Sequence, residues 1–208
     1  MIWEILWGFE PALITGFVIA GLILNITPGA DFLYIMSSGL SGGSRIGVAA
    51  ALGVNLGVVV HILAAAAGLS ALLFAHPAAY DLIRICGAAY LAWMAVQVWR
   101  RSSTVARARS FPDVRQAARR GFFINVSNSK TALFIFAFIP QFTDPTIGPI
   151  WVQILILGAI FLLNGAVFTL CLGVGSGYFA AALGRRVGVL NKISAILLGG
   201  LAARLIID

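Results

Sequence analysis

Charged residues are scarce in this sequence. Of its 208 residues, 10% are Asp, Glu, Lys or Arg, whereas 61% are hydrophobic and the mean hydropathy is +1.00. A soluble domain carries about 25% charged residues, so this chain lacks the charge to cover a surface that faces water. The composition excludes a soluble enzyme and a disordered chain, and it predicts an integral membrane protein.

Cysteine is also scarce. Cys86 and Cys171 lie far apart, each within an apolar segment. The C-x-x-C and Cys/His spacings of metal sites and redox pairs are missing, so we expect neither a disulfide scaffold nor a metal site. The glycine-rich run 173–177 follows no predicted strand and therefore fails as a nucleotide loop. No cofactor is expected.

Acidic residues are half as numerous as basic ones, 7 against 14, which gives a net charge of +7. Seven arginines and one aspartate fall within residues 100–120. Nothing beside this segment resembles a nucleic-acid reading module, so we expect no nucleic-acid partner. A cytoplasmic loop between membrane spans explains this charge better.

Long apolar runs are abundant. A helix needs about 20 apolar residues to cross a bilayer, and six runs approach or exceed that length: 11–38, 46–75, 80–99, 121–142, 149–178 and 189–207. We therefore predict an all-α membrane protein with six transmembrane helices. Because Lys and Arg concentrate in cytoplasmic loops, loop 100–120, Arg45 and the group Arg185, Arg186 and Lys192 are expected inside. Both termini would then face the periplasm.

Two segments of the chain resemble each other. LNITPGADFLYI (24–35) aligns with INVSNSKTALFI (124–135), so that Asn25 matches Asn125. An odd number of spans in each half inverts the second half relative to the first, an arrangement typical of secondary transporters. The predicted division is a first three-span repeat (1–99), a basic cytoplasmic loop (100–120) and a second three-span repeat (121–208).

The first span of each half is interrupted. Pro28 removes a backbone donor and Gly29 weakens the helix after Thr27, while Asn128 and Ser129 compete for backbone hydrogen bonds. Paired interruptions at corresponding positions point to a binding site at the bilayer midplane. The alternative is a proline kink and a polar patch that only help helices to pack.

Two ionisable residues lie inside these interrupted spans. A central Asp or Lys costs about 2.5–3.5 kcal/mol on insertion scales, so Asp31 and Lys130 are expected to face protein or water. They occupy neighbouring positions of the repeat and could meet, either as a gate that opens and closes or as a fixed buried pair. His61 is either a proton carrier or an ordinary packed residue.

Uncharged polar residues complete the candidate site, although single amides such as Gln141 also hold membrane helices together. No catalytic or metal-ligating residue is expected. The predicted substrate and proton pathway comprises Asn25, Thr27, Pro28, Gly29, Asp31, Asn55, His61, Asn125, Asn128, Lys130 and Gln141.

The segment TPGADFLY (27–34), followed by Gly53, Gly57 and His61, resembles the LysE-type translocator family, bacterial exporters of amino acids. FIPQF (138–142) continues the resemblance, whereas Ser129 stands where the family has proline. The resemblance implies an inner-membrane exporter of amino acids or close analogues, driven by proton antiport. Small-residue helix faces permit a homodimer.

In the predicted mechanism, the amino acid's carboxylate lies near half-helix N-terminal N–H groups and Lys130. Its ammonium faces Asp31 and the carbonyls around Asn25 and Asn125, and Asp31 exchanges a proton for substrate. The alternatives are a transporter of another small solute or cation, and, less favoured, a membrane-embedded enzyme or a structural membrane protein. The sequence does not identify the amino acid.

Overall fold

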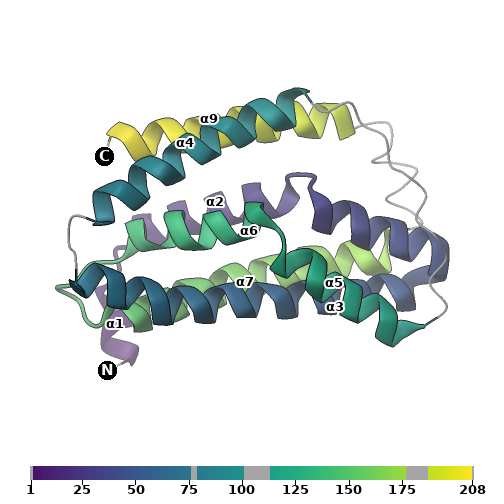
Figure 1. Ribbon diagram of the computed structural model, residues 1–208, viewed down its shortest axis with the longest axis horizontal. Coiled ribbons are helices and arrows are strands. Elements are labelled where there is room, and N and C mark those ends of the chain that lie inside the picture. The colour runs from purple at the N-terminus through teal and green to yellow at the C-terminus, as the bar shows by residue number, and fades with distance from the viewer. Residues whose placement is uncertain (1, 76–78, 101–112, 177–186, 208) are drawn as a thin grey trace.

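The computed structural model describes residues 2–75, 79–100, 113–176 and 187–207. Within these ranges all regular structure is helical. Most of the predicted basic loop, together with Arg185 and Arg186, lies outside the described residues. The helices run roughly along the long axis of the molecule (Figure 1).

The helices, in chain order, are α1 (Ile2–Gly8), α2 (Pro11–Ile26), α3 (Ala30–Ala75), α4 (Ala79–Arg100), α5 (Val114–Val126), α6 (Ser129–Leu133), the π-helical η1 (Phe134–Phe138), the 3₁₀-helical η2 (Ile139–Phe142), α7 (Ile150–Val174) and α9 (Val187–Ile207). Both interruptions predicted from the sequence are present. Residues 27–29 separate α2 from α3, and residues 127–128 separate α5 from α6.

Helix α3 folds back on itself at Gly43. This glycine has φ 78° and ψ 177°, a backbone conformation that side chains with a Cβ rarely adopt. A straight helix would hold Asp31 and Asn55 about 36 Å apart, yet both line one cavity. The chain therefore reverses between the first two predicted spans, as Figure 1 shows.

Three helical segments are long and apolar enough to cross a membrane: Ala30–Gly68, Asp81–Arg100 and Ile150–Val174. The count becomes four when α5 and the helix after it, which meet at 51°, are taken as one broken span. Pro11–Ile26 and Asn191–Ala203 are apolar but shorter. The chain is thus a multi-pass helical membrane protein, and the count of six spans stays a prediction.

Helix α5 begins before the apolar run that predicted it. The run starts at residue 121, whereas the helix starts at Val114, where the Asp113 side chain accepts a hydrogen bond from the Arg115 backbone N–H at 3.1 Å. Arg115 and Arg119 are exposed on these first turns. A search for apolar length misses them because they are polar and need not lie in the hydrocarbon.

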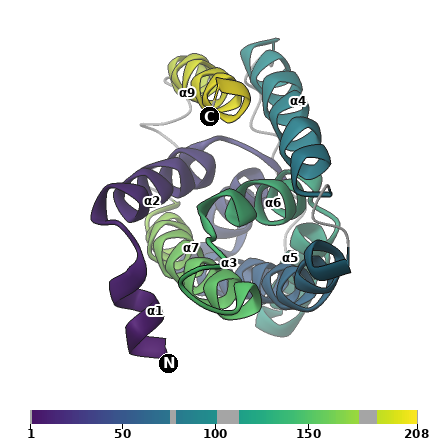
Figure 2. The ribbon, with the colours of Figure 1, turned by 90° about the vertical axis from the view of Figure 1, so that its left-hand side faces the viewer.

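Close backbone contacts pack α3 against α5. A Cβ on Gly53 would overlap the Ala118 carbonyl, and a Cβ on Gly121 would overlap the Ala50 carbonyl. Such small-residue contacts let membrane helices approach closely. Helices α4 and α9 instead lie side by side along one flank of the molecule (Figures 1 and 2).

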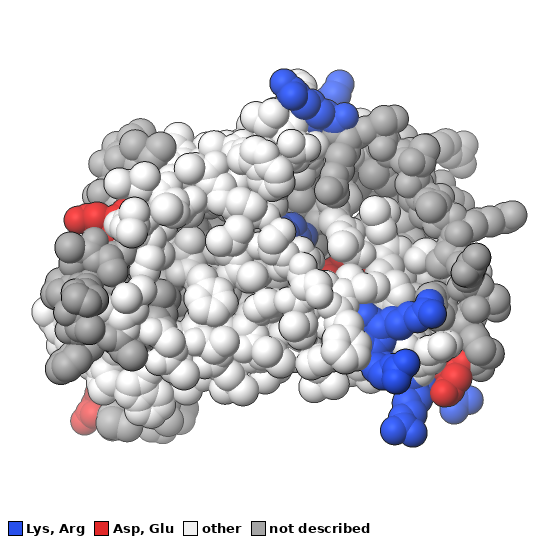
Figure 3. Space-filling view, in the orientation of Figure 1, with Lys and Arg blue, Asp and Glu red and all other residues white. Residues whose placement is uncertain are grey.

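The two ends of the molecule differ in charge. Both termini lie at one end (Figure 1), and in Figure 3 most basic side chains gather at the opposite end. The long side between them is almost free of charge in this view, apart from one basic and one acidic group that show through its middle.

Candidate functional site

The first break follows from Pro28. A residue before proline is pushed out of the helical region, and Thr27 is extended, with φ −61° and ψ 118°. Proline has no N–H, so the Leu24 carbonyl loses the donor that an uninterrupted helix would supply four residues later. It accepts instead from the Thr27 N–H at 3.2 Å. The break therefore leaves backbone acceptors inside the protein.

Lys130 supplies the missing donors. Its Nζ donates to the Leu24 carbonyl at 3.1 Å and to the Thr27 carbonyl at 3.1 Å. A Cβ on Gly29 would lie 3.2 Å from this Nζ, so the glycine leaves room for the ammonium. The lysine of the second break thus completes the hydrogen bonding of the first.

The second break is capped by its own side chains. Asn128 has φ −83° and ψ 99°, and its Oδ1 accepts from the Lys130 backbone N–H at 3.0 Å. The Asn125 carbonyl accepts from the Asn128 N–H at 2.8 Å, and it lies 3.0 Å from His61 Nε2. A carbonyl only accepts, so Nε2 of His61 carries the proton and donates it.

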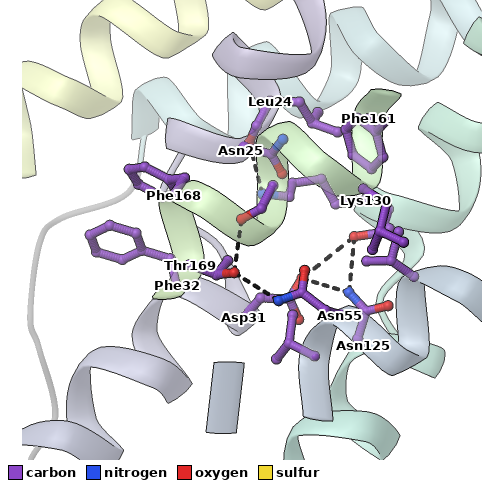
Figure 4. A pocket seen from close by; sticks show the side chains of 15 residues that line it. Leu24, Asn25, Asp31, Phe32, Asn55, Asn125, Lys130, Phe161, Phe168 and Thr169 are labelled. Atoms are coloured by element: carbon purple, nitrogen blue, oxygen red, sulfur yellow. Dashed lines mark hydrogen bonds between the residues drawn. The ribbon is translucent and has the colours of Figure 1, made fainter. Parts of the chain in front are cut away.

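Asp31 connects the two breaks. Its Oδ2 accepts from Asn125 Nδ2 at 3.0 Å (Figure 4). It also accepts from Asn128 Nδ2 at 2.7 Å, and Thr131 Oγ1 lies 3.5 Å away. Asp31 is 9% exposed and Asn125 is fully buried. Hydrogen bonds to an ionised group are the strong ones, so these amides stabilise a buried carboxylate.

Three polar atoms beside these hydrogen bonds lack a protein partner. Among the described side chains, Asp31 Oδ1, Asn125 Oδ1 and Asn25 Nδ2 are buried and unpaired. Their residues line one cavity of about 30 Å³ (Figure 4). Leaving such a group unsatisfied costs about 1–3 kcal/mol, and orphaned groups that share a cavity are typical of a ligand site.

A second cavity lies on the other side of Lys130. Its volume is about 280 Å³, and Pro28, Gly29 and Lys130 form one wall. Helix α4 forms the facing wall with Tyr90 and Trp93. Lys130 lines both cavities, whereas Asp31 lines the smaller one only.

Most of the predicted site residues come together. Around the smaller cavity lie Asn25, Asp31, Asn55, Asn125 and Lys130. Thr27 and Asn128 belong to the hydrogen bonds of the breaks, His61 contacts Asn125, and Pro28 and Gly29 line the larger cavity. Gln141 lines neither cavity, and its Nε2 donates to the Ala137 carbonyl of its own segment at 2.6 Å.

Two threonines were missed by the sequence analysis. Thr131 lies beside Asp31, and Thr169 of α7 accepts from Asn55 Nδ2 at 2.9 Å. The repeat alignment carried a signal for Thr131, since it is the position that matches Asp31. No repeat match distinguishes Thr169 from the other residues of its apolar helix.

The polar residues gathered here are mostly amides and hydroxyls around one carboxylate and one ammonium group. Over the described part of the chain, no three His, Cys, Asp or Glu side chains gather as a metal site would require. A multi-pass helical membrane protein with paired helix breaks around a buried carboxylate belongs to the transporter class.

The comparison with family models identifies the family. The model of the LysE type translocator matches residues 22–208, so the chain belongs to that family and the resemblance seen in the sequence is confirmed. This membership points to a transporter rather than an enzyme.

Similar proteins are membrane and efflux proteins. The chain is 33% identical over 175 residues to an uncharacterised membrane protein of Vibrio cholerae, with 82% of each chain covered. It is 30% identical to a homoserine/homoserine lactone efflux protein of Salmonella typhimurium, covering 68% of this chain and 69% of that protein. It is 28% identical to a leucine efflux protein of an Enterobacter species, covering 91% and 92%. No solved structure gives a significant match to this chain.

Proposed function

We propose that this protein exports amino acids or close analogues across the bacterial inner membrane by proton antiport. The family and the names of the efflux relatives support the cargo. The observation that carries the proposal is the buried carboxylate of Asp31, a residue that lines the small cavity. The second break binds this carboxylate through Oδ2, while Oδ1 is buried without a hydrogen-bond partner.

The half-bound carboxylate suits an exchange of proton for substrate. Oδ1 of Asp31 can accept either a proton or a hydrogen bond from the ammonium of an amino acid, and the two occupants exclude each other. Such mutual exclusion is what antiport requires. The amino acid's carboxylate is expected near Lys130 and the first N–H groups of α3. His61 uses Nε2 on the Asn125 carbonyl, so only its Nδ1 is open to a relayed proton.

The size of the small cavity supports alternating access. About 30 Å³ holds one or two water molecules and is too small for an amino acid. Substrate binding therefore needs the helices around the breaks to move apart. Inverted repeats that rock against each other around a fixed midplane site provide such a movement.

The shape of the molecule supports six spans in two inverted repeats, divided as 1–99, 100–120 and 121–208. Both termini lie at the same end, which an even number of crossings requires (Figure 1). Basic side chains gather at the other end (Figure 3). By the positive-inside rule this other end is cytoplasmic and the termini are periplasmic.

Uptake into everted inner-membrane vesicles tests the proposal. Labelled homoserine, leucine, threonine and lysine are offered with and without an imposed proton gradient. We expect gradient-dependent uptake of at least one of them, and alkalinisation of the vesicle lumen as substrate enters. Equal uptake with and without the gradient would contradict proton antiport. If vesicles that contain folded protein take up no amino acid, the proposed cargo is contradicted.

Asp31→Asn is the matching variant. It keeps the size of the side chain but cannot release a proton, so coupled uptake is expected to fall to background. Asp81→Asn is the control, because Asp81 is exposed at the start of α4. The thermal unfolding temperature in detergent should be similar in both variants. Full gradient-driven uptake by Asp31→Asn would overturn the role of Asp31.

A further inference from the structure

We propose that the larger cavity, between α4 and the two breaks, binds the side chain of the transported amino acid and selects uncharged side chains. This inference rests on the proposed function and names the substrate class of the same site. The cavity has a volume of about 280 Å³. Ligand sites start at about 300 Å³, so this volume suits one small solute.

The position of Lys130 places the two cavities on one ligand path. Lys130 lines both cavities, and the smaller cavity of about 30 Å³ has no room for a side chain. An amino acid whose charged groups reach Lys130 and Asp31 must therefore direct the rest of its structure toward α4. The larger cavity is the space available on that side.

The α4 wall is apolar and aromatic. Tyr90, Trp93, Met94 and Val98 line it, and Ile124 of α5 continues it. The rings of Trp93 and Tyr90 contact each other with centroids 5.4 Å apart and planes tilted by 34°, so they form one continuous apolar surface. Such a surface removes an aliphatic or aromatic side chain from water and offers it dispersion contacts.

The charges of the lining exclude ionised side chains. Among the described residues around this cavity no side chain is acidic, and the one basic residue is Lys130. A cationic side chain would lose its hydration without gaining a counter-charge, which is costly at membrane depth. An acidic side chain would compete with the substrate's own carboxylate for Lys130.

Two polar groups near the rim limit the size and allow weak polarity. Tyr90 Oη donates to Ser129 Oγ at 3.4 Å and so joins α4 to the start of α6. Gln97 also lines the cavity. Small hydroxyl groups and aliphatic groups can therefore be accommodated together.

Selectivity ratios test this inference. Uptake of labelled leucine, phenylalanine and lysine is measured in everted vesicles that carry the full chain. The wild type is expected to take up leucine in preference to lysine. Trp93→Ala enlarges the cavity, and the ratio of phenylalanine to leucine uptake should rise about tenfold, within the range that one missing apolar contact gives. Trp99→Ala is the control, since Trp99 is exposed on the same helix outside the cavity.

A charge variant gives a second, independent result. Gln97→Glu places a carboxylate in the wall and should raise lysine uptake relative to leucine about tenfold. A wild type that prefers lysine, or unchanged ratios in both variants while the wild type still exports, would overturn the inference and leave the proposed function intact. A wild type that moves no amino acid would instead remove the proposed function itself.

Discussion

The two helix breaks occupy matching positions of the repeat, but their chemistry is opposite. In each hydrogen bond described between them, the donor belongs to the second break and the acceptor to the first. Asn128 and Lys130 donate, whereas Asp31 and the Leu24 and Thr27 carbonyls accept. Similar backbones thus carry complementary side chains.

The difference indicates how two similar sequence segments can form the proposed site. Two identical breaks would place like groups against each other across the pseudo-symmetry axis, and acceptors cannot bind acceptors. Substitution of alanine by lysine and of aspartate by threonine between the copies, at positions 30/130 and 31/131, removes that conflict. The retained pair Asn25 and Asn125 shows the same rule, because one amide is bonded to Asp31 while Asn25 Nδ2 is unpaired.

Making the two breaks alike should have the largest effect. Asn128→Asp replaces the donor at 2.7 Å from Asp31 with a second carboxylate. A hydrogen bond to a charged group contributes about 1.5–3 kcal/mol, and repulsion adds to its loss. We expect uptake to fall more than about 100-fold, as measured by initial rates in everted vesicles. Asn128→Ala removes the donor without adding a negative charge, so uptake should fall less than in Asn128→Asp. Equal losses of uptake in the two variants would contradict the idea that repulsion between two acceptors adds to the loss of the hydrogen bond.

Removing the Lys130 side chain, the main donor of the second break, should have an effect nearly as large. Lys130→Met leaves the Leu24 and Thr27 carbonyls without their side-chain donor and should lower the free energy of unfolding by about 2–4 kcal/mol. Pro28→Ala restores a backbone N–H for the Leu24 carbonyl. The double variant is therefore expected to be more stable than additivity predicts, by about 1 kcal/mol. Strict additivity in detergent unfolding would show that Pro28 and Lys130 act independently.

A steric change can disturb the second break alone. A Cβ on Gly57 would lie 2.7 Å from the Cβ of Asn125, so Gly57→Ala must displace that asparagine. Overpacking of this kind costs about 1–3 kcal/mol, and uptake should fall about tenfold with the loss of one bond to Asp31. Gly68→Ala on the same helix is the matched control, since a Cβ there meets nothing within 4 Å. Equal uptake by the two variants would argue against a role for the Asn125 position.

The longest hydrogen bond described between the breaks, from Thr131 to Asp31, should have the smallest effect on uptake. Thr131 Oγ1 lies 3.5 Å from Asp31, at the limit of a hydrogen bond. Thr131→Val keeps the shape and should reduce uptake about two- to fivefold, corresponding to roughly 0.5–1 kcal/mol. Thr131→Ser should retain wild-type uptake. A loss from Thr131→Val as large as that from Asn128→Ala would mean that this bond shortens in another state of the transport cycle.

The positions of the breaks could be predicted because they are encoded locally. Pro28 lacks a donor whatever surrounds it, and Asn128 caps a helix through its own side chain. The apolar runs likewise predicted most of the helical segments, but not α1 or the polar first turns of α5. A sequence without a structure could also place Asp31 and Lys130 near one level, since they occupy neighbouring positions of the repeat.

The partners of these residues could not be predicted, because they depend on how distant helices meet. Lys130 binds backbone carbonyls, which no sequence pattern marks as open to a side chain. Trp93 lines a cavity while being 55% exposed, and its sequence pattern is the same as that of a lipid-facing aromatic residue. Gln141 was predicted from its amide alone, without the repeat match that Asn125 has, and this amide donates to the Ala137 carbonyl of η1.

The direction of the hydrogen bonds between the breaks has a consequence for biosynthesis. The acceptors are made first, and Lys130 follows Thr27 by 103 residues. At a synthesis rate of about 5–20 residues per second, the carbonyls of the first break are made roughly 5–20 s before Lys130, their side-chain donor. During that time the nascent first half carries a carboxylate and open carbonyls that hydrocarbon cannot solvate. It is therefore expected to stay near water until the second half inserts, so that the two halves enter the bilayer as a single unit.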